Sequence, residues 1–224
     1  RPAAIIRRFG LGASTDRWDD LTAYLEEKGY TREELNLAGL TVVKGDSAYD
    51  MFRSRAMFPI IDQYGHVLGF GGRAMNDAKP KYLNTSDTPV FNKRKGVYAA
   101  NLLKKQRNLK RVILVEGYMD VIVLHQEGFR NTVCPMGTAL TDFQAKQLTR
   151  QTKHIVLALD GDAAGDHAAV KDIDIIREAS IADVPGEGQA LLRQEHRLNV
   201  DIRIVTIPEG LDPDEVVLES HETW

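Results

Sequence analysis

Acidic residues follow three apolar stretches of the chain, at the points where buried strands would end. They are Glu116 after residues 112–115, Asp160 and Asp162 after residues 154–159, and Asp212 and Asp214 after residues 201–207. Because ligands of open α/β sheets bind at the carboxyl ends of the strands, these carboxylates are expected at one edge. Grouped carboxylates repel one another unless cations neutralise them, and oxygen ligands favour Mg²⁺ or Mn²⁺. The pattern predicts a metal site that handles phosphate, with all five residues as ligands.

Each acidic group alone also has a purely structural interpretation. Asp-Gly-Asp at residues 160–162 is common in turns, Asp212 followed by Pro213 is a favourable helix start, and Glu116-Gly117 fits a strand-to-helix turn. Their placement after successive strands favours the shared site. Two roles stay open: Glu116 is a ligand or a general base, and Asp120 supports the site as a catalytic residue or favours a helix N-terminus.

The second half of the chain alternates strand-like and helix-like segments. Apolar strands are predicted at residues 112–115, 132–135, 154–159 and 201–207, with helices at 118–127, after the capping box Thr141…Gln144, and at 163–179. Such alternation indicates an α/β fold with a mostly parallel sheet covered on both faces. Residues 182–199 interrupt the pattern and are interpreted as an insertion without an assigned role.

The first half has a mixed α+β character. Two short helices are predicted within residues 14–38, the second opened by the capping box Thr31…Glu34, and two strands at 57–62 and 67–71 flank a turn. Residues 76–95 are expected to form a loop and residues 96–108 a helix. We therefore expect two domains, residues 1–108 and residues 109–224.

The net charge of -3 conceals a strong segregation of charge. Residues 73–111, called the basic segment below, hold eleven Lys and Arg against two acids, so the rest of the chain is net acidic. A basic surface beside metal-binding carboxylates suits a nucleic acid or nucleotide, although a solvated lysine-rich face is the alternative. The candidate residues for binding a nucleotide or a nucleic acid strand are Arg53, Arg55, Arg73, Lys81, Tyr82, Asn84, Lys93 and Lys95. Tyr82 either stacks on a base or packs in the core.

Composition sets the class of protein. With 43% hydrophobic and 27% charged residues, the 224-residue chain matches ordinary globular proteins and is neither disordered nor collagen-like. The single cysteine, Cys134, excludes an internal disulfide or cysteine-rich zinc site in these residues and favours a cytoplasmic setting. No apolar stretch is long enough to span a membrane. The six histidines show no ligand spacing. The chain starts at Arg1, which predicts a piece of a longer protein.

A glutamate after the first strand and Asp-x-Asp after a later one resemble the Toprim fold of topoisomerases, primases and certain nucleases. Further motifs make the chain similar to the bacterial DnaG-type primases. They are Glu-Gly-Tyr-Met-Asp at 116–120, Asp-Gly-Asp-Ala-Ala-Gly at 160–165, Met-Phe-Pro-Ile at 57–60, Gly-Phe-Gly-Gly-Arg at 69–73, Pro-Lys-Tyr-Leu-Asn at 80–84 and Arg-Arg-Phe-Gly-Leu-Gly at 7–12. The resemblance spans essentially the whole chain.

This resemblance implies the RNA polymerase domain of a primase, with an N-terminal basic subdomain followed by a Toprim catalytic subdomain. Such a domain makes RNA primers on a single-stranded DNA template at the replication fork, from nucleoside triphosphates and with Mg²⁺ or Mn²⁺. Zinc is expected only in another domain of the family, and the replicative helicase is expected to bind a C-terminal domain; neither lies in these residues.

Two other functions remain open from the sequence. The chain could belong to another Toprim enzyme, a nuclease or a topoisomerase fragment, which cleaves DNA without nucleotides. It could instead be a non-catalytic module that binds nucleic acid, in which case its carboxylates would be dispensable while the basic segment mattered. Primer synthesis from labelled nucleotides distinguishes the three.

Overall fold

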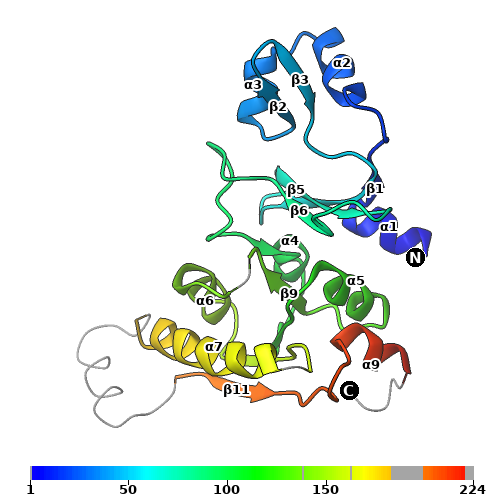
Figure 1. Ribbon diagram of the computed structural model, residues 1–224. Helices are drawn as coiled ribbons and strands as arrows, with labels where there is room; N and C mark the ends of the chain where they lie inside the picture. Colours follow the sequence, from blue (N-terminus) through cyan, green and yellow to red (C-terminus); the bar gives the residue numbers. More distant parts are fainter. Residues whose placement is uncertain (1, 138, 162, 183–198, 220–224) are drawn as a thin grey trace. The chain divides into compact units, whose positions relative to one another are not determined.

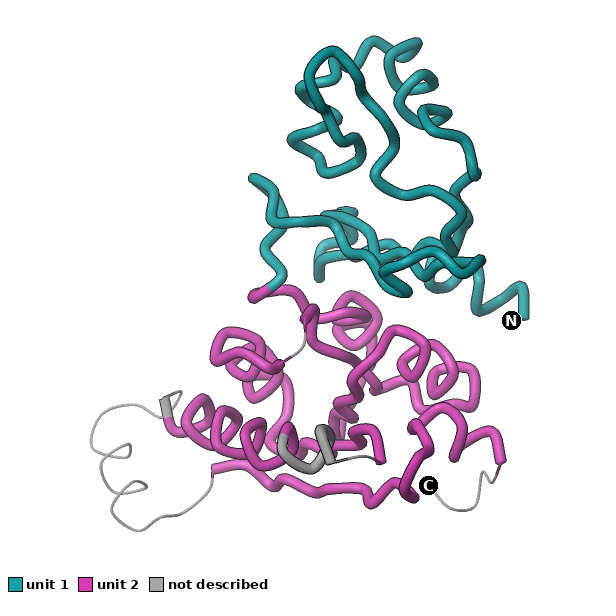
Figure 2. Tube along the Cα trace, viewed as in Figure 1, with its two compact units in different colours: residues 1–93 teal, residues 94–224 magenta. Residues whose placement is uncertain are grey.

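The computed structural model describes residues 2–137, 139–161, 163–182 and 199–219, and within its longest helix the side chains of residues 168–181. The chain divides into two compact units, Arg1–Lys93 and Arg94–Trp224 (Figure 2). The boundary expected from the sequence lies later, after residue 108, and stays a prediction about the domains of the protein.

Unit 1 combines three short helices with small antiparallel sheets (Figure 1). Its elements are α1 (Ala3–Phe9), β1 (Gly12–Ala13), α2 (Asp20–Glu27), α3 (Arg32–Leu37), β2 (Thr41–Lys44), β3 (Ser47–Asp50), β4 (Arg55–Ile61), β5 (Val67–Ala74) and β6 (Tyr82–Asn84). One sheet has the order β1-β4-β5-β6, and β2 and β3 form a separate hairpin. The predicted pair of strands around residues 63–65 is confirmed as β4 and β5.

Carboxylates fix the starts of two of the three helices in unit 1, α2 and α3. At α3 the predicted capping box is present: the Glu34 N–H donates to Thr31 Oγ1 at 3.2 Å, and the Thr31 N–H donates to Glu34 Oε2 at 2.8 Å. At α2, the buried Asp50 accepts from the N–H groups of Leu21 and Thr22, both at 2.8 Å. Helix α2 is thereby tied to the end of β3, because the capping group comes from that strand.

The glycine run in β5 permits close packing. A Cβ at Gly72 would lie 2.8 Å from the Phe52 ring and 2.9 Å from Cδ of Arg55. Glycine is therefore required where β5 lies against these two side chains. The opposite face of the strand carries Arg73, whose neighbour in the register is Tyr82 on β6.

Unit 2 contains a five-stranded sheet in the order β11-β10-β8-β9-β7. Its elements are β7 (Val97–Tyr98), α4 (Ala100–Lys104), β8 (Val112–Leu114), α5 (Tyr118–Gln126), β9 (Thr132–Pro135), α6 (Asp142–Thr149), β10 (His154–Leu157), α7 (Ala163–Ala182), β11 (Asp201–Ile204) and α9 (Pro213–Glu219). All neighbouring strands are parallel except β7, which pairs antiparallel with β9. The predicted α/β class with a mostly parallel sheet is confirmed.

The helices of unit 2 pack in two pairs, α6 with α7 and α5 with α9, which lie to either side of β9 in Figure 1. Helix α5 is apolar nearly all round: residues Val121, Ile122, Val123 and Leu124 are fully buried. Helix α6 begins with the predicted capping box, since the Thr141 N–H donates to Gln144 Oε1 at 2.9 Å and the Gln144 N–H donates to Thr141 Oγ1. The sheet and these helices hold the core of the unit.

Two sequence expectations need correction. Residues 96–108 do not form one helix, because the buried Val97 and Tyr98 pair with Pro135 and Cys134 as β7, and only Ala100–Lys104 is helical. Within the expected loop at 76–95, residues 82–84 form strand β6. The expected insertion at 182–199 falls largely on residues 183–198, which lie outside the described residues. In the described part of the chain, no helix is long and apolar enough to cross a membrane.

Candidate active site

Glu116 and Asp160 meet at the carboxyl edge of the sheet. Strands β8 and β10 are parallel neighbours, with Leu114 opposite Leu157, so the residues that follow them emerge side by side. The Asp160 N–H donates to Oε1 of Glu116 at 3.2 Å. This bond orients the exposed Glu116 carboxylate toward the turn after β10 and confirms that the two segments share an edge.

A second turn closes on the first from the segment that leads to Asp212. The Gly161 N–H donates to the Leu211 carbonyl at 3.1 Å, and the Gly210 N–H donates to the Gly161 carbonyl at 3.0 Å. A Cβ at Gly161 would lie 2.2 Å from the Pro208 carbonyl oxygen. Glycine at position 161 is therefore a condition for joining the two acidic turns.

Asp120 is buried and lies in the first turn of α5. Its carboxylate accepts from the Gly117 N–H at 2.9 Å, which caps the helix. Burial raises the pKa of Asp120 to about 8; the charges of Asp214, Asp160 and Asp212 act in the same direction, and the Gly117 hydrogen bond opposes them. Asp120 therefore favours the helix N-terminus, as one sequence interpretation expects, and its role in the site stays a prediction.

Asp212 and Asp214 come from the start of α9, which packs against α5. The Asp212 N–H donates to Glu215 Oε2 at 3.1 Å, so this segment is a capped helix start, as the structural interpretation expects. Asp212 is exposed and Asp214 is partly buried. The charges of both residues raise the pKa of Asp120, and their role as metal ligands stays a prediction.

The chemistry of the donor set fits a divalent cation, because the four predicted ligands that the structure describes, Glu116, Asp160, Asp212 and Asp214, all offer hard oxygen atoms. Asp162, the remaining predicted ligand, lies outside the described residues. Within the described ranges, no three His, Cys, Asp or Glu side chains converge as a ready-made metal site.

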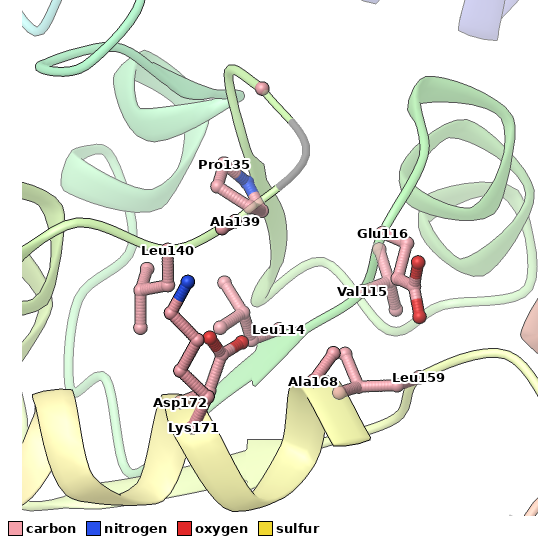
Figure 3. A pocket seen from close by; sticks show the side chains of 11 residues that line it. Leu114, Val115, Glu116, Pro135, Ala139, Leu140, Leu159, Ala168, Lys171 and Asp172 are labelled. Atoms are coloured by element: carbon pink, nitrogen blue, oxygen red, sulfur yellow. The ribbon is translucent and has the colours of Figure 1, made fainter. Parts of the chain in front are cut away.

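A cavity of about 260 Å³ opens beside Glu116, between β8, the segment after β9, and α7 (Figure 3). Asp172 and Lys171 lie on the α7 side, across the cavity from Glu116. Burial raises the pKa of Asp172 to about 6, the Glu116 charge adds to this, and the hydrogen bond from the Leu140 N–H and the Lys171 charge oppose it. Asp172 was not among the residues predicted from the sequence. The available signal was an acid on the apolar face of this helix, which also carries the buried Ala169, Ile176 and Ala179.

Two predicted template-binding arginines of unit 1 are engaged within the unit. The Arg53 guanidinium lies 4.2 Å from the Trp18 ring and 5.1 Å from the Tyr49 ring, and it donates to the Asp50 carbonyl. Arg55 is buried, with 5% of its surface exposed, and donates to the carbonyls of Gly72, Pro80 and Lys81. Desolvation lowers the pKa of Arg55, and the charge of Arg53 adds to this. Its contacts favour a structural role.

The remaining candidates in unit 1 present polar surface. Arg73 pairs with Tyr82 across β5 and β6, and Asn84 lies two residues beyond Tyr82, so the three side chains share one face of the sheet. Arg73 and Lys81 are exposed, and 39% of the Tyr82 surface is exposed, which contradicts core packing and leaves stacking on a base as its open role. Lys93 is partly exposed, and its N–H donates to Asp87 Oδ1 at 2.9 Å.

In unit 2, the Lys95 ammonium lies 5.5 Å from the centre of the exposed Phe143 ring. Such a contact is a weak attraction at an exposed site, so Lys95 remains accessible to solvent. The described histidines for which the structure gives burial, His66, His125 and His154, are either buried in unit 2 or exposed at the surface. His125, for example, is buried and hydrogen-bonds the Thr132 carbonyl at 2.9 Å.

Comparison with known proteins identifies both parts of the chain. Residues 2–104 match the N-terminal domain of the DNA primase catalytic core, and residues 113–190 match the Toprim-like family. The chain is 44% identical over 215 residues to a DNA primase from Clostridium acetobutylicum, covering 96% of this chain and 33% of that protein. It thus spans about a third of the length of the curated relatives it matches.

Solved structures agree with these matches. The RNA polymerase domain of the primase DnaG from Mycobacterium tuberculosis has 30% identity and a TM-score of 0.80, covering 97% of this chain and 68% of that one. A DnaG primase catalytic domain bound to single-stranded DNA has 32% identity and a TM-score of 0.83, covering 98% of this chain and 64% of that one. The chain therefore belongs to the family of DnaG-type DNA primase catalytic cores.

Proposed function

We propose that this chain catalyses template-directed synthesis of RNA primers on single-stranded DNA from nucleoside triphosphates. The observation that supports the proposal is that Glu116 accepts from the Asp160 N–H at the carboxyl edge of a parallel sheet, while the buried Asp120 is influenced by the charges of Asp160, Asp212 and Asp214. Family membership adds to it, and the relative solved with single-stranded DNA supports that strand as the template.

In the proposed reaction a 3′-hydroxyl attacks an α-phosphate, a new P–O bond forms, and the bond to the leaving pyrophosphate breaks. The Toprim primase family generally uses divalent cations. Bound at this site, Mg²⁺ or Mn²⁺ would neutralise charge on the attacking and leaving oxygens. Asp160, Asp162, Asp212 and Asp214 would hold the cations, and Glu116 would either join them or accept the hydroxyl proton.

The chain's own contribution is the positioning of these groups. The Asp160 N–H fixes the direction of the Glu116 carboxylate, and the turn at Gly161 holds the acidic segments together. Asp120 fixes the start of α5, directly after Glu116, through its bond to the Gly117 N–H. Because such geometry exists before substrate binds, little reorganisation is needed during the reaction.

The basic residues supply the proposed binding surface. Arg73, Lys81 and Lys93 would contact phosphates, Tyr82 would stack on a base, and Asn84 would donate hydrogen bonds beside it. In unit 2, the exposed Lys95 would also contact phosphate. The helicase and zinc-binding expectations concern domains outside these residues.

The test supplies single-stranded template, labelled nucleoside triphosphates and Mg²⁺ or Mn²⁺ to the protein and looks for short RNA. Asp160→Asn should abolish the product, and Asp142→Asn, an exposed carboxylate on α6, is the matched control. DNA cleavage without nucleotides would instead indicate a nuclease. Template binding with neither activity would indicate a non-catalytic module.

A further inference from the structure

A second pocket lies at the opposite edge of the unit 2 sheet from the carboxylates. It is about 590 Å³ in volume and is formed where β8, β10 and β11 begin. The three strands are parallel neighbours, with His154 opposite Asp201 and Ile155 opposite Val112. Each of these strands is about 10 to 13 Å long. The pocket and the carboxyl edge lie at opposite ends of the strands, so the strand length separates them.

The pocket is strongly basic. Its charged and titratable lining residues are Lys110, Arg111, Lys153, His154, Asp201 and Arg203. All six are exposed, and Asp201 is the one acid among these lining residues. Four permanent positive charges therefore surround a single negative one, in a unit whose other edge is acidic.

Hydrogen bonds fix the wall of this pocket. The buried Thr152 donates through Oγ1 to the Lys110 carbonyl at 3.1 Å and accepts from the His154 N–H at 3.1 Å, so it joins the starts of β8 and β10. Asp201 Oδ2 lies 3.2 Å from both His154 Nδ1 and Arg203 Nε. The Asp201 N–H donates to the Lys153 carbonyl at 2.7 Å. The backbone that carries the cations is thereby held in place.

We propose that this pocket binds phosphates of a single DNA strand, as a second contact with the template beyond the catalytic edge. Lys110, Arg111, Lys153 and Arg203 would each neutralise strand phosphate, while Asp201 holds Arg203 in position. Adjacent strands of a sheet lie about 4.8 Å apart, so these cations span roughly 10 Å across three strands. That width accommodates consecutive phosphates rather than one small anion.

The lining favours a nucleic acid over an acidic peptide. Peptide interfaces depend on apolar or aromatic anchors in pockets, and the apolar lining residues Ile155, Val156 and Leu109 are all buried or partly buried. Among the described residues that line the pocket there is no Phe, Tyr or Trp, and the one aromatic ring, the His154 imidazole, is hydrogen-bonded to Asp201, so contact is expected mainly with the phosphate backbone. Binding should therefore be independent of sequence and strongly dependent on salt. The inference rests on the proposed function only in identifying the strand as the template.

The test compares Lys110→Gln/Lys153→Gln with Lys44→Gln/Lys146→Gln, which removes two lysines from outside the pocket and the basic segment. Binding of fluorescent oligothymidylate of about 30 nucleotides, longer than the roughly 4 to 16 covered by one single-strand site, is measured across a salt series. Loss of two phosphate contacts should reduce the slope of log affinity against log salt by about 1.4. The affinity should fall several-fold at low salt, and the control variant should match the wild type.

An unchanged slope and affinity in the pocket variant would overturn the proposal, as would an equal loss in the control. A polyglutamate peptide that binds the wild type but not the pocket variant, with DNA binding unchanged, would assign the pocket to an acidic protein instead. Primer synthesis by the wild-type protein is measured separately. Failure of the pocket proposal is therefore distinguishable from failure of the proposed function.

Discussion

The Asp160 N–H and the Glu116 carboxylate are joined by a 3.2 Å hydrogen bond across 44 residues of sequence. The bond connects the turn after β8 with the turn after β10, and the backbone bonds of Gly161 extend the connection to the segment before α9. Three acidic segments are therefore linked by hydrogen bonds of the backbone in the turn at residues 160–161, one of which ends on the Glu116 side chain. The site geometry consequently depends on the turns as much as on the carboxylates themselves.

Removing the charge of Asp160 should abolish function while preserving the fold. Asp160→Asn should reduce primer synthesis by roughly two orders of magnitude or more, the scale on which one electrostatic group acts in an active site. Its backbone N–H is unchanged, so the bond to Glu116 is kept. Primer yield at saturating nucleotide is the measurement, with Asp142→Asn as control. Near-normal yield would remove Asp160 from the proposed machinery.

Asp120 should make the metal-free protein less stable as the pH rises. Its pKa is about 8 in the folded state against an ordinary value of 3.8, so folding favours the protonated form. This contribution is complete below pH 4 and is lost as the pH rises toward 8, at about 1.4 kcal/mol for each pKa unit. The amide in Asp120→Asn stays neutral at every pH, so this variant should show a flatter dependence of stability on pH between pH 4 and 8.

Denaturant unfolding in EDTA between pH 4 and 8 measures the difference between wild type and Asp120→Asn. The variant retains an oxygen that can accept from the Gly117 N–H, so the helix cap is preserved. Parallel stability profiles for the two proteins would show that Asp120 is ionised in the folded state and would contradict its assigned environment.

Gly161→Ala should damage the site through the backbone. The added Cβ would lie 2.2 Å from the Pro208 carbonyl oxygen, so one of the two turns must move. Overpacking of this kind costs about 1 to 3 kcal/mol, and primer synthesis should fall with it. Gly12→Ala is the control, because a Cβ there meets nothing within 4 Å. Equal melting temperatures for both variants would refute the close approach.

Substitutions of Arg55 and Arg73 should have different effects, because Arg55 has a structural role in unit 1 and Arg73 has a proposed role in binding DNA. Arg55→Met leaves three carbonyl oxygens without their buried donor and should cost about 1 to 3 kcal/mol of stability. Arg73→Met removes an exposed charge and should chiefly weaken single-stranded DNA binding and its salt dependence. Thermal melts and anisotropy titrations of both variants decide this. The reverse pattern would return Arg55 to the template surface.

Local signals allowed much of this structure to be predicted from the sequence. The capping boxes at Thr31 and Thr141 are present, and the alternation of apolar strands and helices gave the parallel sheet and placed Glu116 beside Asp160. These features depend on neighbours within a few residues, or on the general rule that parallel strands end at one edge.

The features that could not be predicted from the sequence depend on partners far away along the chain. Val97 and Tyr98 form a strand only because β9 offers an edge, so residues 96–108 were assigned to a helix. Arginine is usually a surface residue, but Arg55 is buried and donates to the backbone carbonyl of Pro80, which lies 25 residues along the chain. Asp172 lines the cavity beside Glu116, and its pKa is set by burial, by the Glu116 charge and by a hydrogen bond from the Leu140 N–H. Both partners are more than 30 residues away in the sequence, so no local pattern indicates them.

The central claim is that the carboxylates at the carboxyl edge jointly hold divalent cations. A Mn²⁺ titration followed by thermal melting tests it on wild type, Glu116→Gln and the control Asp142→Asn. Ligands that bind only the folded state raise its stability with concentration. The account predicts that Mn²⁺ raises the melting temperature of wild type and control, and that Glu116→Gln loses much of this rise. A rise that survives the substitution in full, or no rise in the wild type, would contradict it.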